Sequence, residues 1–212
     1  MKKGFLAIAA SLCLSLGAMA QQATGTWTLT PKAGINSSNM SVEDLWIGTN
    51  SDRAVSAKHK WGFVGGLEAE YQAWQQIGIS AGAYYSNEGY TYGDIEELGK
   101  VTETLHFINI PVLVNFYIEP NILPGLALKA GVQFGYLLSA KNKTGDMTTT
   151  STSNFKRVNI SIPAGISFSY KNFVADLRYN IGVMNLCNIE LEVEDSWKSN
   201  SLWITVGYQF HL

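Results

Sequence analysis

From about residue 26 onward, apolar and polar side chains alternate with a period of two, which is the pattern of half-buried β-strands. The apolar phase is clearest at the C-terminus, where its members are Ile204, Val206, Tyr208, Phe210 and Leu212. After the N-terminal segment, no stretch keeps a helical period over three turns or is apolar enough for a transmembrane helix. The alternation predicts eight strands, near residues 26–36, 61–74, 77–88, 104–117, 126–140, 155–170, 173–182 and 199–212.

The connections between these segments alternate between long and short. The long ones cover residues 37–60, 89–103, 141–154 and 183–198, the tight ones residues 75–76 and 171–172, and one of medium length covers residues 118–125. Short periplasmic turns and longer extracellular loops are typical of barrels in a bacterial outer membrane. Because a bilayer tolerates no open sheet edge, eight such strands must close on themselves. The sequence therefore predicts an all-β fold, an eight-stranded antiparallel up-and-down transmembrane β-barrel.

The two faces of the strands differ sharply. The phase expected to face lipid collects Leu29, Ala33, Ile35, Ile77, Ile79, Ala81, Ala83, Ile108, Ile110, Val112, Val114, Leu128, Val132, Phe134, Ile160, Ile162, Ile166 and Phe168. The opposite phase is polar and collects Lys32, Glu68, Glu70, Asn109, Asn115, Lys129, Gln133, Asn159, Ser161, Ser167, Asp176, Arg178, Asn180 and Gln209.

Six members of the polar phase carry charge, three of each sign: Lys32, Glu68, Glu70, Lys129, Asp176 and Arg178. Opposite charges enclosed together can pair and so offset their desolvation. Side chains just fill the interior of an eight-stranded barrel. We expect a structural charge network, with Glu68 and Glu70 as partners of the bases, and a plugged lumen instead of a channel.

Aromatic residues gather near strand ends, as expected of rings at the headgroup level. Those expected on the turn side are Trp27, Tyr71, Tyr117, Tyr170, Phe173 and Phe210, and those on the loop side are Trp61, Tyr85 and Tyr136.

Composition and the first residues support export. Charged residues make up 15% of the chain, against about 25% in soluble domains. Two lysines, an apolar run and Ala18-Met19-Ala20 have the order of a secretory signal. We expect cleavage after Ala20, so that residues 1–20 form the signal peptide and residues 21–212 the barrel domain.

Charge and cysteine content exclude several classes. The formal net charge is −2, and loss of Lys2 and Lys3 leaves 13 bases against 17 acids, or −4, so nucleic acid is not an expected partner. The mature chain would keep Cys187 alone, which excludes an internal disulfide and a thiol metal cluster.

No catalytic site is recognisable. His59, His106 and His211 are scattered, and none stands beside a serine motif or at metal-ligand spacing. We predict no catalytic residue, cofactor or metal. Three alternatives stay open: a lipid-modifying or hydrolytic barrel that uses His106 or His59, a small porin, and a soluble ligand-binding barrel.

Two of the expected external loops are acidic. The second carries Asp94, Glu96, Glu97 and Glu103, and the fourth carries Glu190, Glu192, Glu194 and Asp195. Clustered carboxylates can bind divalent cations or a basic partner, although solvated loop charge is the commoner explanation. The third loop, residues 142–154, is rich in Ser and Thr and is expected to be mobile and exposed.

Four segments resemble a known family. Leu105–Tyr117 (LHFINIPVLVNFY), Pro31–Asn36 (PKAGIN), Trp61–Leu67 (WGFVGGL) and Val206–Phe210 (VGYQF) are similar to the PorT-like small outer-membrane barrels of Bacteroidota. The resemblance implies an outer-membrane location and a role in assisting protein secretion, and it supplies no catalytic residues. The chain departs from many such barrels by ending in His211-Leu212, and we expect Phe210 to serve as the terminal aromatic.

The sequence thus predicts a non-enzymatic integral outer-membrane barrel with an envelope structural or surface-interaction role. Its expected partners are outer-membrane lipid and envelope or secretion-system proteins, and we expect a monomer.

Overall fold

The computed structural model describes residues 23–41, 57–95, 99–119, 122–145, 147–186 and 198–212. Almost all of them lie in strands. These are β1 (Trp27–Ser41), β2 (Ala57–Trp74), β3 (Ile77–Ile95), β4 (Gly99–Tyr117), β5 (Leu126–Thr144), β6 (Met147–Thr150), β7 (Val158–Tyr170), β8 (Phe173–Gly182), β9 (Lys198–Tyr208) and β10 (Phe210–His211), with one short 3₁₀ helix, η1 (Thr152–Asn154).

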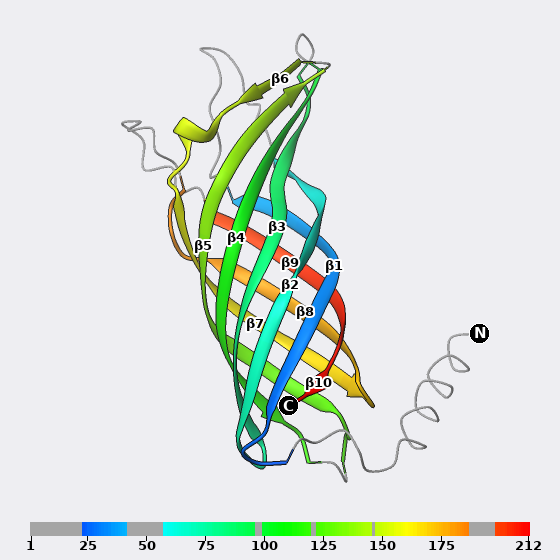
Figure 1. The fold of residues 1–212 in the computed structure, drawn as a ribbon. Helices are drawn as coiled ribbons and strands as arrows, with labels where there is room; N and C mark the ends of the chain where they lie inside the picture. Colours follow the sequence, from blue (N-terminus) through cyan, green and yellow to red (C-terminus); the bar gives the residue numbers. More distant parts are fainter. Residues whose placement is uncertain (1–22, 42–56, 96–98, 120–121, 146, 187–197) are drawn as a thin grey trace, which may run out of the picture.

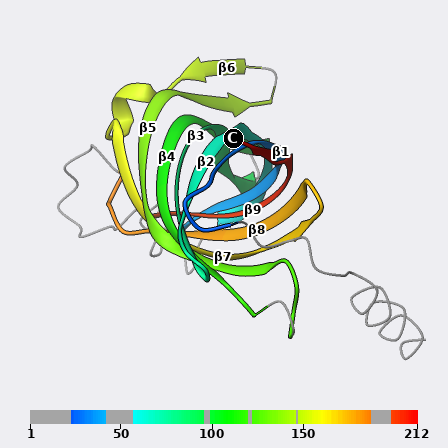
Figure 2. The same cartoon turned by 60° about the horizontal axis from the view of Figure 1, so that its bottom comes forward.

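The sheet closes into a barrel, as the alternation predicted. Each main strand pairs antiparallel with the next one along the chain, and β1 pairs with β9, where Ile35 lies opposite Ile204. Two short strands add to this wall without enlarging the ring: β6 pairs only with β5, and β10 continues β9 alongside β1. The closed ring and the outlying β6 are visible in Figure 1 and, from the lower end, in Figure 2. The prediction of eight wall strands is confirmed.

One end of the barrel, here called the turn end, carries the short connections. Gln75-Gln76 links β2 to β3, and Lys171-Asn172 links β7 to β8, with Lys171 in the left-handed region at φ 53°. The C-terminus also lies there, because the Leu212 amide donates to the Trp27 carbonyl. In outer-membrane barrels, short turns of this kind lie on the periplasmic side.

The opposite end, here called the loop end, differs from the prediction. Strands β3, β4 and β5 run 7, 5 and 4 residues past the bounds predicted for them, so much of residues 89–103 and 141–144 is strand and not loop. Residues 37–41 and 57–60 are strand as well. The alternation breaks there, because Gly89 and charged residues interrupt it, but Tyr and Thr residues in both hairpin arms favour strand.

The two faces of the wall are as predicted. Residues of the apolar phase face outward, and among them Ile79, Ile110, Val114 and Val132 are 44–52% exposed. All fourteen residues of the polar phase are buried on the inside. The outer surface is therefore an apolar belt suited to lipid. No helix within the described residues is long and apolar enough to cross a membrane.

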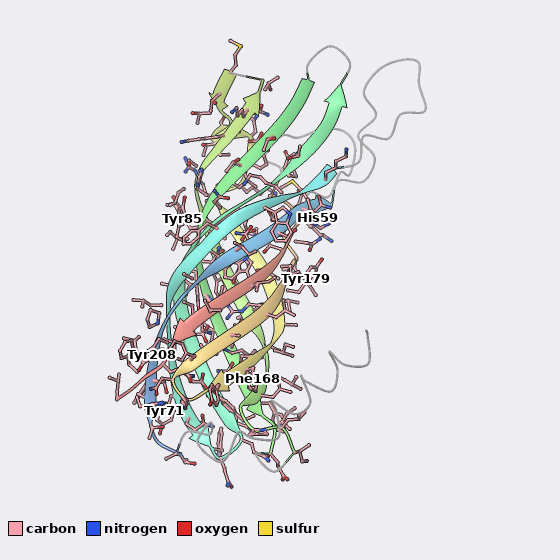
Figure 3. All side chains as sticks on the ribbon, turned by 90° about the vertical axis from the view of Figure 1, so that its right-hand side faces the viewer. His59, Tyr71, Tyr85, Phe168, Tyr179 and Tyr208 are labelled. Atoms are coloured by element: carbon pink, nitrogen blue, oxygen red, sulfur yellow. The ribbon has the colours of Figure 1, made fainter. Side chains whose placement is uncertain are left out.

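Rings mark both edges of the belt. In Figure 3, His59 and Tyr85 lie in the upper part of the wall, and Tyr71, Phe168 and Tyr208 in the lower part. At the turn end, Trp27 packs on Tyr71 with 5.1 Å between ring centroids. The prediction is wrong for Tyr117, which is only 5% exposed and points inward. Its phase on β4 is that of Asn115, so the ring belongs to the lumen and not to the lipid face.

Candidate functional site

The centre of the lumen holds an ion-pair cluster contributed by four strands. It consists of Lys32 on β1, Glu68 on β2, Lys129 on β5, and Asp176 and Arg178 on β8, and all five side chains are at most 4% exposed. The period of two aims each of them inward, and antiparallel pairing brings them to one level. We call this set the lumen cluster.

Within the lumen cluster, the two lysines bridge the two carboxylates. Lys32 Nζ lies 2.8 Å from Glu68 Oε1 and 3.1 Å from Asp176 Oδ2. Lys129 Nζ makes the same two contacts at 2.7 and 3.2 Å. Because charges from opposite walls meet at these distances, the side chains extend across the lumen.

Arg178 connects the lumen cluster to the aromatic rings of Tyr84 on β3 and Trp203 on β9. Its Nη2 donates to Glu68 Oε2 at 3.0 Å, and the Tyr84 hydroxyl donates to the same oxygen at 2.9 Å. The guanidinium also lies 5.6 Å from the Tyr84 ring centroid and 5.7 Å from that of Trp203. Cation–π attraction of this kind holds the guanidinium between the two rings.

Glu70, the sixth predicted member, has a different partner. Its carboxylate accepts a hydrogen bond of 2.5 Å from the Tyr117 hydroxyl, and no ion pair joins it to a base among the described residues. The prediction that it pairs with a lysine or arginine is wrong, because Glu70 lies two residues closer to the turn end than Glu68. Gly78 leaves the space for it, since a Cβ at Gly78 would collide with Glu70 Oε1.

A second filling closes the lumen toward the loop end, and sequence reasoning missed it. It is an apolar cluster of buried side chains: Met40, Tyr90, Leu105, Phe107, Leu137, Ala140, Phe155 and Leu186. We call it the mouth cluster. Leu105 and Phe107 have the same inward phase as Asn109, so the alternation along β4 could have placed them in the lumen. Polarity alone does not identify them, because both side chains are apolar.

The third loop helps to cover the mouth cluster. Residues 147–150 pair with β5, and η1 follows and delivers Phe155, which is buried. Beneath it, Glu103 accepts hydrogen bonds from Ser151 and from Asn142 Nδ2, the latter at 2.8 Å. Burial raises the pKa of Glu103, partly offset by these two hydrogen bonds. The third loop is exposed in β6, as predicted, although it contains regular structure, and Glu103 is enclosed instead of standing on an acidic rim.

The remaining acidic residues give no described site. Glu96, Glu97, Glu190, Glu192, Glu194 and Asp195 lie outside the described residues, and Asp94 is in β3 with a side chain that is not described. Within the described part of the chain, no group of three His, Cys, Asp or Glu residues could hold a metal ion.

The three histidines lie on three different strands. His106 Nδ1 is 2.6 Å from the Tyr85 hydroxyl, His59 Nδ1 is 3.4 Å from Ser37 Oγ, and His211 is exposed in β10. A distance of 3.4 Å is long for a hydrogen bond. The contacts given by the described residues do not assemble a nucleophile, a base and an orienting group.

Comparisons with known proteins agree with this architecture. Residues 19–188 match the family described as outer membrane protein beta-barrel domain. No curated protein matches the sequence.

Several solved structures have a similar fold. Neisserial surface protein A (NspA) is 13% identical over 87% of this chain and 97% of its own, with a TM-score of 0.51. The outer membrane protein OprG from Pseudomonas aeruginosa is 12% identical over 92% of this chain and 100% of its own, with a TM-score of 0.50. Ail, the attachment invasion locus protein of Yersinia pestis, is 15% identical over 89% and 100%, with a TM-score of 0.49. At these identities the likeness concerns the fold alone.

Proposed function

Because this chain belongs to the outer membrane protein beta-barrel domain family, we propose that it is a closed, non-enzymatic barrel that acts through contacts made at its loop end. The family and the fold place the barrel in the outer membrane. The closed lumen, the absence of enzymatic activity and the surface contacts are the parts that we propose.

The observation that carries the proposal is the length of three neighbouring strands. At the level where Tyr136 pairs with Val158, β7 begins, whereas β5 continues for eight more residues to Thr144. Strands β3 and β4 continue beside it, and β6 adds a fourth strand (Figure 1). Eight residues of strand extend roughly 25 Å. The barrel therefore presents a sheet beyond the bilayer, which we call the outer sheet.

The outer sheet offers groups that a partner could contact. All four residues of β6 are exposed, and Met147 is 78% exposed. The edge of β6 that faces away from β5 pairs with no other described strand. An unpaired edge is a template for strand addition by another chain.

The filled lumen argues against the porin alternative. The lumen cluster crosses the barrel at mid-height, and the mouth cluster fills it above. An open pore would need both fillings to move. The lipid-facing belt, in turn, is unsuited to the soluble-barrel alternative, because it exposes large apolar side chains all around the wall.

Two narrower parts of the proposal concern export and pathway. Residues 1–20 would direct export and be removed after Ala20. The similarity to PorT-like barrels of Bacteroidota favours an envelope or secretion-system protein as the partner of the outer sheet, with the barrel itself monomeric.

Photocrosslinking in intact cells tests the surface role. A photoreactive amino acid at Met147 or Thr149 should give a discrete crosslinked product with an envelope protein, and the same residue at Val206, which faces lipid, should not. Crosslinking that is equal at all three positions, or absent from Met147 and Thr149, would contradict the proposal.

Two measurements separate the alternatives. In planar bilayers the purified barrel should show no steady conductance, and a large steady current would establish a pore. In detergent the purified barrel should not hydrolyse phospholipid or lipopolysaccharide. Turnover that is lost in at least one of the variants His106→Ala and His59→Ala would establish the enzyme.

A further inference from the structure

Charge is segregated at the loop end of the wall. The described basic side chains exposed there are Lys58, Lys141, Lys143, Lys156, Arg157 and Lys198. The two carboxylates whose side chains are described at the same end, Glu88 and Glu103, are buried at 4% and 3% exposure. At the turn end, by contrast, Lys171 and Glu119 are both exposed. Among the described residues, the exposed charge is therefore net positive at the loop end and balanced at the turn end.

Three basic groups from β2, β4 and β5, namely Lys60, His106 and Lys141, belong to one part of this rim. His106 of β4 lies opposite Asn87 of β3 on one side and Ser139 of β5 on the other. Lys141 of β5 lies opposite Thr104, which is two residues from His106 along β4. From β2, Lys60 Nζ reaches Asn87 Oδ1 at 3.0 Å. We call Lys60, Tyr85, His106 and Lys141 the rim patch.

Tyr85 fixes the orientation of the His106 ring. The two rings are stacked with 6.0 Å between centroids, and the Tyr85 hydroxyl lies 2.6 Å from Nδ1. When Nδ1 accepts a hydrogen bond from the Tyr85 hydroxyl, the neutral imidazole carries its proton on Nε2. That N–H is then available as a donor on the outer surface, and the charges of Lys141 and Lys60 act on the same ring.

No carboxylate in the described part of the chain forms an ion pair with the rim patch. Partial burial lowers the pKa of His106, and the positive charges of Lys141 and Lys60 lower it further. Glu88 is the carboxylate that acts on Lys60, and it is enclosed in the barrel and bound to Ser86. Like charges held together on a rigid wall repel one another, and a bound anion removes that repulsion.

The depth of the rim patch in the membrane indicates which molecule would supply such an anion. Tyr85, Ile108 and Tyr136 lie at one level and mark the loop-end edge of the apolar belt. His106 lies two residues beyond Ile108 along β4, and Lys141 lies further out on β5. Lipid phosphates occupy this depth, just outside the hydrocarbon and next to interfacial aromatic rings.

We propose that the rim patch binds the phosphate group of an outer-leaflet lipid, with Lys60 and Lys141 supplying charge and His106 Nε2 supplying a directed hydrogen bond. Charge-assisted hydrogen bonds to phosphate are roughly twice as strong as neutral ones. The bound phosphate links Lys60 of β2 to Lys141 of β5 at the level where the outer sheet leaves the bilayer. It does not depend on a protein partner of that sheet, so the two proposals can fail separately.

A titration of His106 by NMR tests the site on the intact barrel. The barrel is placed in phosphatidylcholine nanodiscs, without and with a minor fraction of phosphatidic acid, which presents a phosphate monoester. Phosphatidic acid should raise the pKa of His106, because the phosphate offsets Lys60 and Lys141. The His59 and His211 signals in the same spectra report the general surface potential and should move less.

Matched variants identify the contact. In Lys141→Gln the response of His106 to phosphatidic acid should disappear, and retention of that lipid in native mass spectrometry should fall about tenfold, as for the loss of one charge-assisted hydrogen bond. Lys171→Gln, which removes an exposed lysine at the turn end, should change neither.

Three results would overturn the inference. His106 could respond no more than His59 and His211, which would mean surface potential only. Lys141→Gln and Lys171→Gln could behave alike, which would mean no defined site. Finally, inorganic phosphate in the buffer of phosphatidylcholine nanodiscs could give the full response, which would assign the site to a soluble anion instead of a lipid.

Discussion

At the scale of single residues, the barrel encloses a group of buried charges that pair with one another. Glu68 accepts from Lys32, Lys129, Arg178 and Tyr84 at once, so its charge is shared among four donors from different strands. A buried carboxylate in such a position contributes little net stability, but its removal leaves three bases facing Asp176 alone.

The substitution Glu68→Gln keeps the volume of the side chain and removes its negative charge. It should destabilise the folded barrel by about 3–5 kcal/mol, because buried positive charges lose their partner. Urea unfolding in detergent micelles, followed by the gel-mobility change of the folded barrel, measures this. The control Glu119→Gln, at an exposed turn position, should stay within about 0.5 kcal/mol; equal effects would contradict the role of the lumen cluster.

The hydrogen bond from Tyr117 to Glu70 can be tested in the same way. Tyr117→Phe should cost about 1–3 kcal/mol, since the buried carboxylate loses a donor that water does not replace freely. Tyr136→Phe, on the outer surface of β5, is the matched control and should be nearly neutral. A neutral Tyr117→Phe would mean that the hydroxyl is dispensable to Glu70.

At the scale of elements, the strand centres were predictable and the loop-end strands were not. The belt residues Ile108, Ile110 and Val112 alternate strictly with Asn109 and Pro111, so period and phase could be read directly. At Phe107 and Leu105 the inner face is apolar as well, and the contrast between the two faces vanishes. Polarity then no longer identifies the lumen, which explains why the mouth cluster and the ends of β3, β4 and β5 were missed.

The lumen charges show the same limit at the candidate site. That Glu68 and Glu70 face inward followed from the alternation, since a lipid-facing carboxylate is costly. Which partner each one takes depends on the stagger between strands that are far apart in the sequence. Lys129 of β5 reaches Glu68, whereas Tyr117 of β4 reaches Glu70, and no local pattern encodes that difference.

Phe155 tests whether the third loop closes the mouth. In Phe155→Ala the buried ring is lost, and the segment should open more often. Hydrogen exchange should then be faster at the amides of Ala140 and Ser151, whose partners are Thr152 Oγ1 and the Ala140 carbonyl. Phe155→Leu, which keeps most of the volume, should exchange nearly as slowly as the wild type. If alanine and leucine exchange alike, Phe155 is not what holds the segment.

At the scale of the whole molecule, one orientation of the wall underlies every other statement. The apolar belt must face acyl chains and the charged phase must be enclosed, because the reverse would expose the lumen cluster to hydrocarbon. Closure of β1 on β9 makes this possible, since it leaves none of the eight described wall strands with a free edge in the bilayer.

Labelling of the wild-type barrel in lipid vesicles by a lipid-soluble photoactivated carbene tests this orientation most directly. Peptide mass spectrometry at residue resolution should find label on Ile79, Ile110 and Ile162 and should find none on their sequence neighbours Ser80, Asn109 and Ser161. Label on those three polar residues, with the isoleucines spared, would show that the barrel is inside out and would contradict the account.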